Sequence, residues 1–327
     1  MRYKNCAPLG ELKWNRLGLM RPGSEPRVFV LGSLNMDVVA TTSRHPMVGE
    51  TVLGSSLNYY PGGKGLNQAV AAVRDRAEVV MLGAVGSDGF GKELLGFVED
   101  EGIVADFVHI NPKAPSGVAL IVVADEGESE GDNTIVVAPG ANGTLTSEMF
   151  AEVKFQSHDV LLAQFETPIS TTTSLFARAK EAGTTTILNP APAGPLSLEL
   201  ASLVDYLVVN DIELTQICQS LEKDITELVD LGIHALIHTK GSDGVAVITS
   251  QESLNLPAHE VAVVDTTAAG DCFCGVLAAS LLSEATVSVA ANRSNAAAAL
   301  SVQNPGATPS LPFAEETEVF LQTVSAS

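Results

Sequence analysis

The chain of 327 residues has few basic side chains, with 18 lysines and arginines against 39 aspartates and glutamates and a formal net charge of −21. Nucleic acids and anionic membranes bind proteins through clustered Lys and Arg, so this balance argues against both as main partners. Long apolar runs are also missing, because none reaches the roughly 18 residues that span a bilayer. No continuous apolar segment follows the amino-terminal basic residues, which argues against a secretory signal.

Cysteine is scarce as well, and Cys6, Cys218, Cys272 and Cys274 are too few for a disulfide framework in a chain of this length. Residues two apart on a helix point to different faces, so Cys272 and Cys274 are expected to be small buried hydrophobic residues rather than a metal or redox pair. Residues 1–26 lack an apolar period and are expected to form a flexible extension. We expect a cytoplasmic protein, or an organellar one if this extension is the remnant of a transit peptide.

Apolar residues make up 46% of the chain, enough for one large α/β domain. Short apolar runs predict buried strands, and stretches of helical length lie between them. This alternation predicts βαβ crossovers and a mainly parallel central sheet with helices on both faces. The expected strands are 28–31, 79–82, 160–162, 186–188, 207–209 and 235–237, and the expected helices are 67–76, 92–101 and 171–182.

Two further expected strands, 116–123 and 134–138, interrupt the alternation and are joined by the acidic turn 125–133. A hairpin inserted into an α/β chain usually lies off the main sheet, and the β-favouring residues before position 60 can pair with it. We therefore predict a small β-sheet that acts as a lid, with the mobility typical of lids. The predicted domain spans 27–327, with its lid at about 37–60 and 112–140.

Polar residues directly follow the first expected strand. Asn35 and Asp37 offer donors and acceptors suited to a polyhydroxy compound, at the strand end where open α/β sheets bind ligands. An Asx turn leaving the strand is the other interpretation, and the spacing alone favours it.

The segment 62–68 has three glycines in its first four residues and opens an alanine-rich helix. Glycines let a backbone approach a ligand closely, and free N–H groups at a helix start favour electron-rich groups. A purely structural loop would not require Lys64, Asn67 and Gln68 together, so ligand binding is favoured. The segment is not a Walker A loop, because no Ser or Thr follows Lys64.

Asp271 is expected at the mouth of a later helix, after the small residues Ala268, Ala269 and Gly270. These small residues allow consecutive N–H groups to converge into an anion hole. The helix dipole favours an ionised carboxylate, which can accept a proton from a substrate hydroxyl as a general base. Asp271 could instead only cap the helix. A second acid, Asp265, at the start of the same segment favours a functional site.

Together, the segments 32–37, 62–69 and 265–271 resemble the ribokinase/PfkB family of carbohydrate kinases, over residues 27–320. The segment 62–69 resembles the form of the glycine motif found in the ribokinase branch, whereas fructokinases and adenosine kinases usually carry other residues there. The resemblance implies a ribokinase-like fold and an ATP-dependent phosphorylation of D-ribose at the 5-hydroxyl, which gives D-ribose 5-phosphate.

The resemblance also implies a role for each matching position. Asp271 would be the general base, and Ala268, Ala269 and Gly270 the anion hole. ATP would be the co-substrate, with Mg²⁺ and an activating monovalent cation, usually K⁺. The sugar site would comprise Asn35, Asp37, Gly63, Lys64, Gly65, Asn67 and Glu166, the nucleotide site Asn210, Glu213, Thr239, Gly241, Ser242, Gly244 and Asn295, and the cation site Asp265, Thr267, Ser301, Asn304, Gly306 and Ser310.

Two other functions fit these residues. Another kinase of the family, acting on fructose, a nucleoside or pseudouridine, would share the base and the anion hole. A non-catalytic sensor that binds a sugar or nucleotide is the second, although the intact Gly270 and Asp271 oppose it. In relatives the lid sheet often forms a dimer contact, so the resemblance implies a homodimer.

Overall fold

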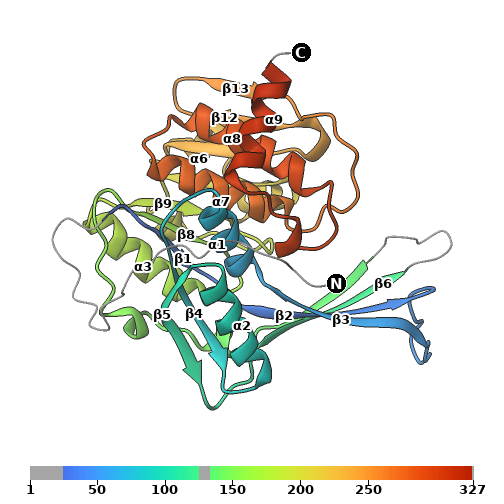
Figure 1. Cartoon of the computed structure of the whole chain (residues 1–327). Helices are drawn as coiled ribbons and strands as arrows, with labels where there is room; N and C mark the ends of the chain where they lie inside the picture. Colours follow the sequence, from blue (N-terminus) through green and yellow to red (C-terminus); the bar gives the residue numbers. More distant parts are fainter. Residues whose placement is uncertain (1–24, 125–132, 326–327) are drawn as a thin grey trace, which may run out of the picture.

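The computed structural model describes residues 25–124 and 133–325 (Figure 1). The expected extension 1–26 lies outside the described residues except for its last two positions, and the acidic turn 125–133 lies outside them except for Asn133.

A mainly parallel sheet forms the body of the molecule. Its strands are β1 (Val28–Leu31), β4 (Val79–Gly86), β5 (Val104–Asn111), β8 (Val160–Ala163), β9 (Thr185–Leu188), β10 (Tyr206–Val209), β11 (Ala235–Thr239), β12 (Val245–Ile248) and β13 (Ser253–Leu256). They lie in the order β13-β12-β11-β10-β9-β8-β1-β4-β5. All neighbours from β11 to β5 are parallel, while β12 and β13 are added antiparallel at one edge.

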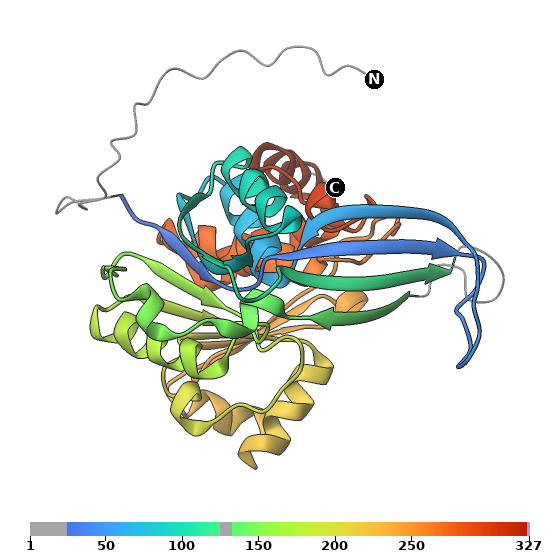
Figure 2. The ribbon, with the colours of Figure 1, turned by 90° about the horizontal axis from the view of Figure 1, so that it is seen from below.

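Helices cover both faces of this sheet, because alternate side chains of each strand point to opposite sides. Val28 and Val30 pack into one core, and Phe29 and Leu31 pack into the other. The first face carries α1 (Lys64–Arg74), α2 (Gly89–Asp100), α7 (Ala269–Leu282) and α8 (Val287–Ser301), with α9 (Ala314–Ser325) on α8; the second carries α3 (Ile169–Glu181), α4 (Leu198–Ala201), α5 (Asp211–Leu221) and α6 (Ile225–Val229). Figure 2 shows the layers from below, and the predicted α/β fold is confirmed.

The six strands and three helices predicted from the sequence are present, with ends that differ by at most three residues except at β4. The strands β5, β12 and β13 were not predicted. In β5 the polar Asp106 and His109 interrupt the apolar run, and β13 is a half-exposed edge strand of alternating pattern. Short 3-10 helices lie at Gly140–Thr144, Ser147–Phe150, Gly241–Asp243 and Thr308–Ser310.

A second, small sheet projects from the body like an arm (Figures 1 and 2). It contains β2 (Asn35–Thr42), β3 (Gly54–Gly62), β6 (Gly117–Ala124) and β7 (Asn133–Ala138), in the order β3-β2-β6-β7. The pairs β2–β3 and β6–β7 are antiparallel, and β2–β6 is parallel. The separate small sheet is therefore present, and its role as a lid stays a prediction.

Asn35 and Asp37 do not form the Asx turn that their spacing favoured. Both belong to β2, where Asn35 pairs with Gly62 on one side and Gly117 on the other. The Asn35 side chain accepts a hydrogen bond from Asn142 Nδ2 at 2.8 Å, 107 residues along the chain. Strand pairing and contacts this distant in sequence override a local turn preference.

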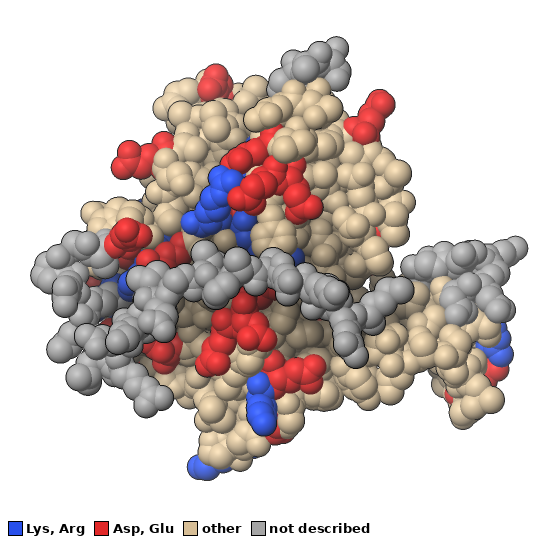
Figure 3. All heavy atoms as spheres, in the orientation of Figure 1, with Lys and Arg blue, Asp and Glu red and all other residues tan. Residues whose placement is uncertain are grey.

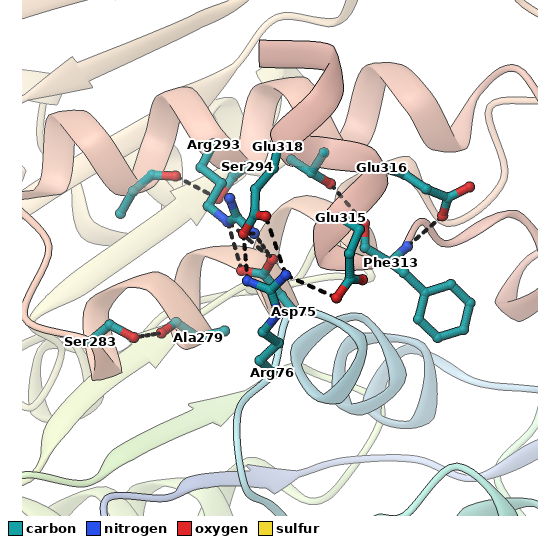
Figure 4. A network of polar contacts seen from close by, with 12 residues as sticks. Asp75, Arg76, Ala279, Ser283, Arg293, Ser294, Phe313, Glu315, Glu316 and Glu318 are labelled. Atoms are coloured by element: carbon teal, nitrogen blue, oxygen red, sulfur yellow. Dashed lines mark hydrogen bonds and ion pairs between the residues drawn. The ribbon is translucent and has the colours of Figure 1, made fainter. Parts of the chain in front are cut away.

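An ion-pair cluster holds the carboxyl-terminal helix α9 against α1 and α8 (Figure 4). Arg76, which follows α1, contacts Glu315 at 2.9 Å and Glu318 at 2.5 Å. Arg293 of α8 pairs with Asp75, whose side chain is only 5% exposed, and lies 3.7 Å from Glu318. The pairs of Arg76 with Glu315 and Glu318 are exposed and contribute little to stability. Removing Arg293 would instead leave the buried Asp75 carboxylate without this partner.

The described surface reflects the acidic composition. On the face shown in Figure 3, Asp and Glu side chains gather in several groups, and Lys and Arg side chains form only small clusters. Among residues 25–124 and 133–325, no helix combines the length and the apolar character that crossing a membrane requires.

Candidate active site

The candidate site lies where the strand order changes direction. From β1, the chain builds β4 and β5 on one side and β8 to β11 on the other. The carboxyl ends of strands at such a switch point frame the crevice in which open α/β folds bind ligands.

A cavity of about 230 Å³ opens beside this switch point, at the carboxyl ends of β9, β10 and β11. It receives side chains from the ends of β9, β10 and β11 and from the starts of α1, α5 and α7. Eight of the predicted site residues line it, from Lys64 on α1 to Asp271 on α7. The lining residues are Lys64, Asn189, Ala191, Val208, Asn210, Glu213, Thr239, Thr266, Ala268, Ala269, Gly270, Asp271 and Cys274.

The helix α7 begins at the cavity with an unusual backbone conformation. Ala268 precedes it with φ 59° and ψ 10°, a left-handed conformation that costs a non-glycine residue about 1–2 kcal/mol. Among the hydrogen bonds of the described residues, none is donated by the backbone N–H groups of Gly270 or Asp271. Free N–H groups at a helix start bind anions, so this end of α7 fits an anion hole that includes Gly270 of the predicted set, whereas the Ala269 N–H donates to Thr266 O at 3.3 Å.

Two amide side chains hold the Asp271 carboxylate. Asn67 Nδ2 donates to Oδ2 at 3.0 Å, and Gln68 Nε2 donates to Oδ1 at 2.9 Å. Asp271 is 6% exposed, lies in the first turn of α7 and lines the cavity. It does not form the capping bond of this helix, so the interpretation as a simple cap is wrong.

The Glu166 side chain forms hydrogen bonds with several residues of the predicted sugar site. Its Oε2 accepts hydrogen bonds from Ser33 Oγ at 2.5 Å, from the Lys64 backbone N–H at 3.1 Å and from Asn35 Nδ2 at 3.4 Å. These groups come from the ends of β1 and β8, the start of β2 and the start of α1. The contacts place Glu166, Asn35 and the glycine loop in one polar cluster.

Acidic side chains dominate the electrostatics of the site. Burial raises the pKa of Asp37 to about 7, and the negative charges of Glu166 and Asp271 add to the rise. Burial also raises the pKa of Glu213. The Asp271 carboxylate raises the pKa of Lys64 against the effect of burial, so Lys64 is held as a cation among carboxylates.

The predicted nucleotide residues fall into three groups. Asn210 and Glu213 form a capping box at the start of α5, with both bonds at 2.9 Å, and Thr239 lines the cavity beside them. Gly244 and Asn295 both lie against Pro257. Asn295 Nδ2 donates to the Pro257 carbonyl at 2.8 Å, and a Cβ on Gly244 would lie 2.7 Å from the Pro257 carbonyl carbon. Gly241 and Ser242, in the preceding exposed turn, do not line the cavity.

The predicted cation residues are only partly assembled. Asp265 accepts hydrogen bonds from the backbone N–H groups of Thr267 and Gly306, each at 2.8 Å, which ties the two loops together. The buried hydroxyls of Ser301 and Ser310 bond to carbonyls of their own turns, and Asn304 is exposed. In the part of the chain that is described, no group of three or more His, Cys, Asp or Glu could hold a metal ion.

Three polar residues of the site received no role from the sequence. Asn142 bonds to Asn35, Asn189 accepts from Gln68 Nε2 at 3.3 Å, and Gln164 donates to Gln68 Oε1 at 2.6 Å. Asn189 directly follows the predicted strand 186–188, so the strand-end rule could have identified it. Cys272 and Cys274 are buried as predicted.

Comparisons with known proteins agree with this geometry. Residues 25–314 match the sequence pattern of the pfkB family carbohydrate kinases. A ribokinase from Bacillus subtilis is 37% identical, with 90% of this chain and 99% of that protein covered. A deoxyribokinase from Salmonella typhi is 32% identical, with 90% and 98% covered. The structure of an Arabidopsis thaliana ribokinase complexed with ribose and ATP superposes with a TM-score of 0.81 at 27% identity, covering 91% of this chain and 99% of that one.

The family match spans most of the chain and includes the segments that build the cavity. The ribokinase-like fold predicted from the sequence is confirmed by these relatives. The chain therefore belongs to the pfkB family of carbohydrate kinases and is an ATP-dependent carbohydrate kinase.

Proposed function

We propose that this kinase phosphorylates D-ribose at the 5-hydroxyl to give D-ribose 5-phosphate. The observation that carries the proposal is the Asp271 carboxylate, held at the mouth of α7 beside two free backbone N–H groups. The similarity to ribokinases supports ribose as the acceptor, and the similarity to a deoxyribokinase keeps deoxyribose as the nearest competitor.

Each part of the site then has a role. Asp271 orients the acceptor hydroxyl and takes its proton late in the transfer, because phosphoryl transfer needs positioning and charge stabilisation more than a strong base. The N–H groups of Gly270 and Asp271 stabilise negative charge on the transferred group. The sugar would lie against Asn35, Asp37, Lys64 and Glu166, with Gly63, Gly65 and Asn67 forming the rest of its site.

The nucleotide would enter past the start of α5. Its phosphates would lie near Asn210 and Glu213, and its base near Asn295. The other predicted nucleotide residues, Thr239, Gly241, Ser242 and Gly244, would lie between these two ends. Glu213 fits a role in holding Mg²⁺, because it lines the cavity with its carboxylate and Mg²⁺ usually takes one or two carboxylates together with phosphates. When bound, Mg²⁺ would neutralise charge on the phosphates.

The remaining predictions concern the surroundings of the site. The small sheet would close over the sugar and exclude water that could otherwise accept the phosphoryl group. We also propose a cytoplasmic homodimer, in which the exposed apolar side chains of the small sheet, such as Leu120, Ile135 and Val136, would lie in the contact.

A screen of ADP release tests the choice of substrate. Ribose, deoxyribose, fructose, adenosine and pseudouridine would be compared at equal concentrations with saturating ATP. We expect D-ribose to give the highest kcat/KM. A higher value for deoxyribose, fructose or a nucleoside would replace ribose as the substrate, and ribose binding without ADP release would favour a sensor.

Potassium is expected to raise the turnover with ribose several-fold over sodium at equal ionic strength. The loops 265–267 and 301–310, which Asp265 and Gly306 join, would bind the ion largely through carbonyl oxygens, with Asp265, Thr267, Ser301, Asn304, Gly306 and Ser310 as the predicted residues. Initial rates in sodium-only and potassium buffers measure the effect. Equal rates in both buffers would remove the cation site from the proposal.

Ribose binding is expected to strengthen as the pH rises from 6 to 8. Burial and the neighbouring acids raise the pKa of Asp37 to about 7, so its carboxyl is mostly neutral at pH 6 and mostly ionised at pH 8. Only the ionised form accepts hydrogen bonds from two sugar hydroxyls with both oxygens. The ribose KM should therefore fall by about tenfold over this range, which follows from the ionised fractions on either side of a pKa near 7. The same slope in an Asp37→Asn variant would show that another group is responsible.

A further inference from the structure

A row of buried amide side chains lies behind the Asp271 carboxylate. Gln68, on α1, is 0% exposed, and its Nε2 donates to Asp271 Oδ1 at 2.9 Å and to Asn189 Oδ1 at 3.3 Å. Its Oε1 accepts from Gln164 Nε2 at 2.6 Å. Asn189 continues the row to Glu213 Oε2, at 3.5 Å.

Gln164 supports the orientation in which the Gln68 amide turns its N–H groups toward Asp271. The Asp271 carboxylate only accepts hydrogen bonds, so it faces the N–H groups of the Gln68 amide, and Gln164 Nε2 donates to the Oε1 atom at the other end of that amide. Gln164 adopts this orientation although its own Oε1, which is buried, has no partner among the described residues. An unsatisfied buried polar atom is destabilising. Gln164 therefore keeps its hydrogen bond to Gln68 at the cost of leaving its own oxygen without a partner.

The close crossing of α1 and α7 brings Gln68 to Asp271. Gly275 lies one turn after Asp271 on the same helix face, and a Cβ at this position would lie 2.3 Å from the Gln68 carbonyl oxygen. The absence of a side chain at Gly275 lets the two helices approach until the Gln68 amide reaches the carboxylate.

We infer that Gln68 is a positioning residue for the phosphoryl transfer, which orients the Asp271 carboxylate through a direct hydrogen bond, and that Gln164 in turn supports the orientation of Gln68. The inference rests on the proposed role of Asp271 as the general base. An N–H donor to a carboxylate stabilises the charged form over the protonated form. A carboxylate with one donor on each oxygen is also fixed about its χ2 torsion, which leaves its remaining lone pairs aimed at the acceptor hydroxyl.

Other groups around Asp271 carry charge or titrate and must be kept constant in any test. Lys64 of α1, Asp37 of β2 and Glu213 of α5 interact electrostatically with Asp271, as do Cys272 and Cys274 on α7 itself. Substitutions at Gln68 or Gln164 remove none of these groups. A change in the pH dependence of such a variant therefore reports on the amide row.

The variant Gln68→Met tests the inference, because methionine has a similar length and offers no donor. With ribose and ATP saturating, kcat should fall by about ten- to hundredfold, the usual effect of losing one hydrogen bond to a charged group. In a plot of kcat against pH, the acidic limb, where kcat falls as the pH is lowered, should move to higher pH. The ribose KM should stay within about twofold of wild type. A purely structural role would lower stability without moving the acidic limb.

The control and the second variant separate these effects. Thr186→Val is the control. It removes a buried hydroxyl of β9 that donates to Leu203 O and Asp205 Oδ2 and does not contact Asp271, so it should lower the melting temperature without moving the acidic limb. Gln164→Met should move the acidic limb in the same direction as Gln68→Met but less. The double variant should resemble Gln68→Met alone, because Gln164 acts through Gln68. If Gln68→Met does not fold, Gln164→Met carries the same test.

Two results would overturn the inference. One is a wild-type kcat and acidic limb in a folded Gln68→Met or Gln164→Met enzyme, and the other is additive losses in the double variant. Its failure is distinguishable from failure of the base assignment. If Asp271→Asn is nearly inactive while Gln68→Met behaves as wild type, only the proposed role of Gln68 is wrong. If Asp271→Asn is active, the assignment of Asp271 as the base is wrong.

Discussion

Replacing Asp271 by Asn is expected to lower kcat by about 10²–10⁴-fold, the usual contribution of a general base. The asparagine keeps the size of the side chain but cannot accept the proton of the sugar hydroxyl. It also turns an N–H group toward one of the two amide donors, Asn67 or Gln68, that now bond the carboxylate. Ribose binding should change little, because Asn35 and Glu166 remain in place. Single-turnover phosphoryl transfer and ribose titration by calorimetry measure the two effects separately.

The Asp271→Asn experiment needs a control for the loss of charge. Glu213→Gln removes another acid that lines the same cavity, so it should weaken the use of ATP and Mg²⁺ rather than the acceptor step. Turnover near the wild-type rate in Asp271→Asn would mean that Asp271 is not the base.

Replacing Gly65 by Ala is expected to destabilise the fold by about 3 kcal/mol or more, at the upper end of the range for overpacking. A Cβ at this position would lie 2.5 Å from the carbonyl carbon of Gly32 and 2.5 Å from the backbone nitrogen of Ser33. Both are backbone atoms that cannot turn away as a side chain would. The shift would also disturb the Lys64 N–H bond to Glu166, so ribose binding should weaken as well. Urea unfolding measures the change in the free energy of unfolding.

Gly96→Ala is the matched control for the glycine experiment. Gly96 lies inside α2, and a Cβ there would meet nothing within 4 Å. Alanine is the better helix former, so this variant should gain about 0.5–1 kcal/mol. A Gly65→Ala protein as stable as wild type would contradict the close approach of α1 to the end of β1.

The parts of the fold that were predictable are those encoded by local pattern. Runs such as 160–162 and 207–209 are apolar at every position because both faces of the central sheet are covered. The edge strand β5 has no such run, since only part of it is buried, and it was missed. The placement of Asn35 in β2 depends on partners at Gly62 and Gly117, so no local rule could have given it.

The candidate site divides in the same way. Asp271 and the glycine loop were recognisable because small residues, a helix start and an acid occur together in sequence. The bond from Asn67 to Asp271 joins residues 204 positions apart, and the bond from Gln164 to Gln68 joins residues 96 apart. Such contacts follow from the crossing of α1 and α7 and from the strand order. A sequence pattern alone does not contain them.

The position of the ribose 5-hydroxyl in a crystal structure with D-ribose and a non-hydrolysable ATP analogue tests the central claim most directly. We predict that O5 lies about 2.6–3.2 Å from the Asp271 carboxylate, the distance at which a base can take its proton. The γ-phosphorus should lie on the far side of O5, against the N–H groups of Gly270 and Asp271. A complex in which a different hydroxyl faces Asp271, or in which the γ-phosphate lies away from these N–H groups, would contradict the account.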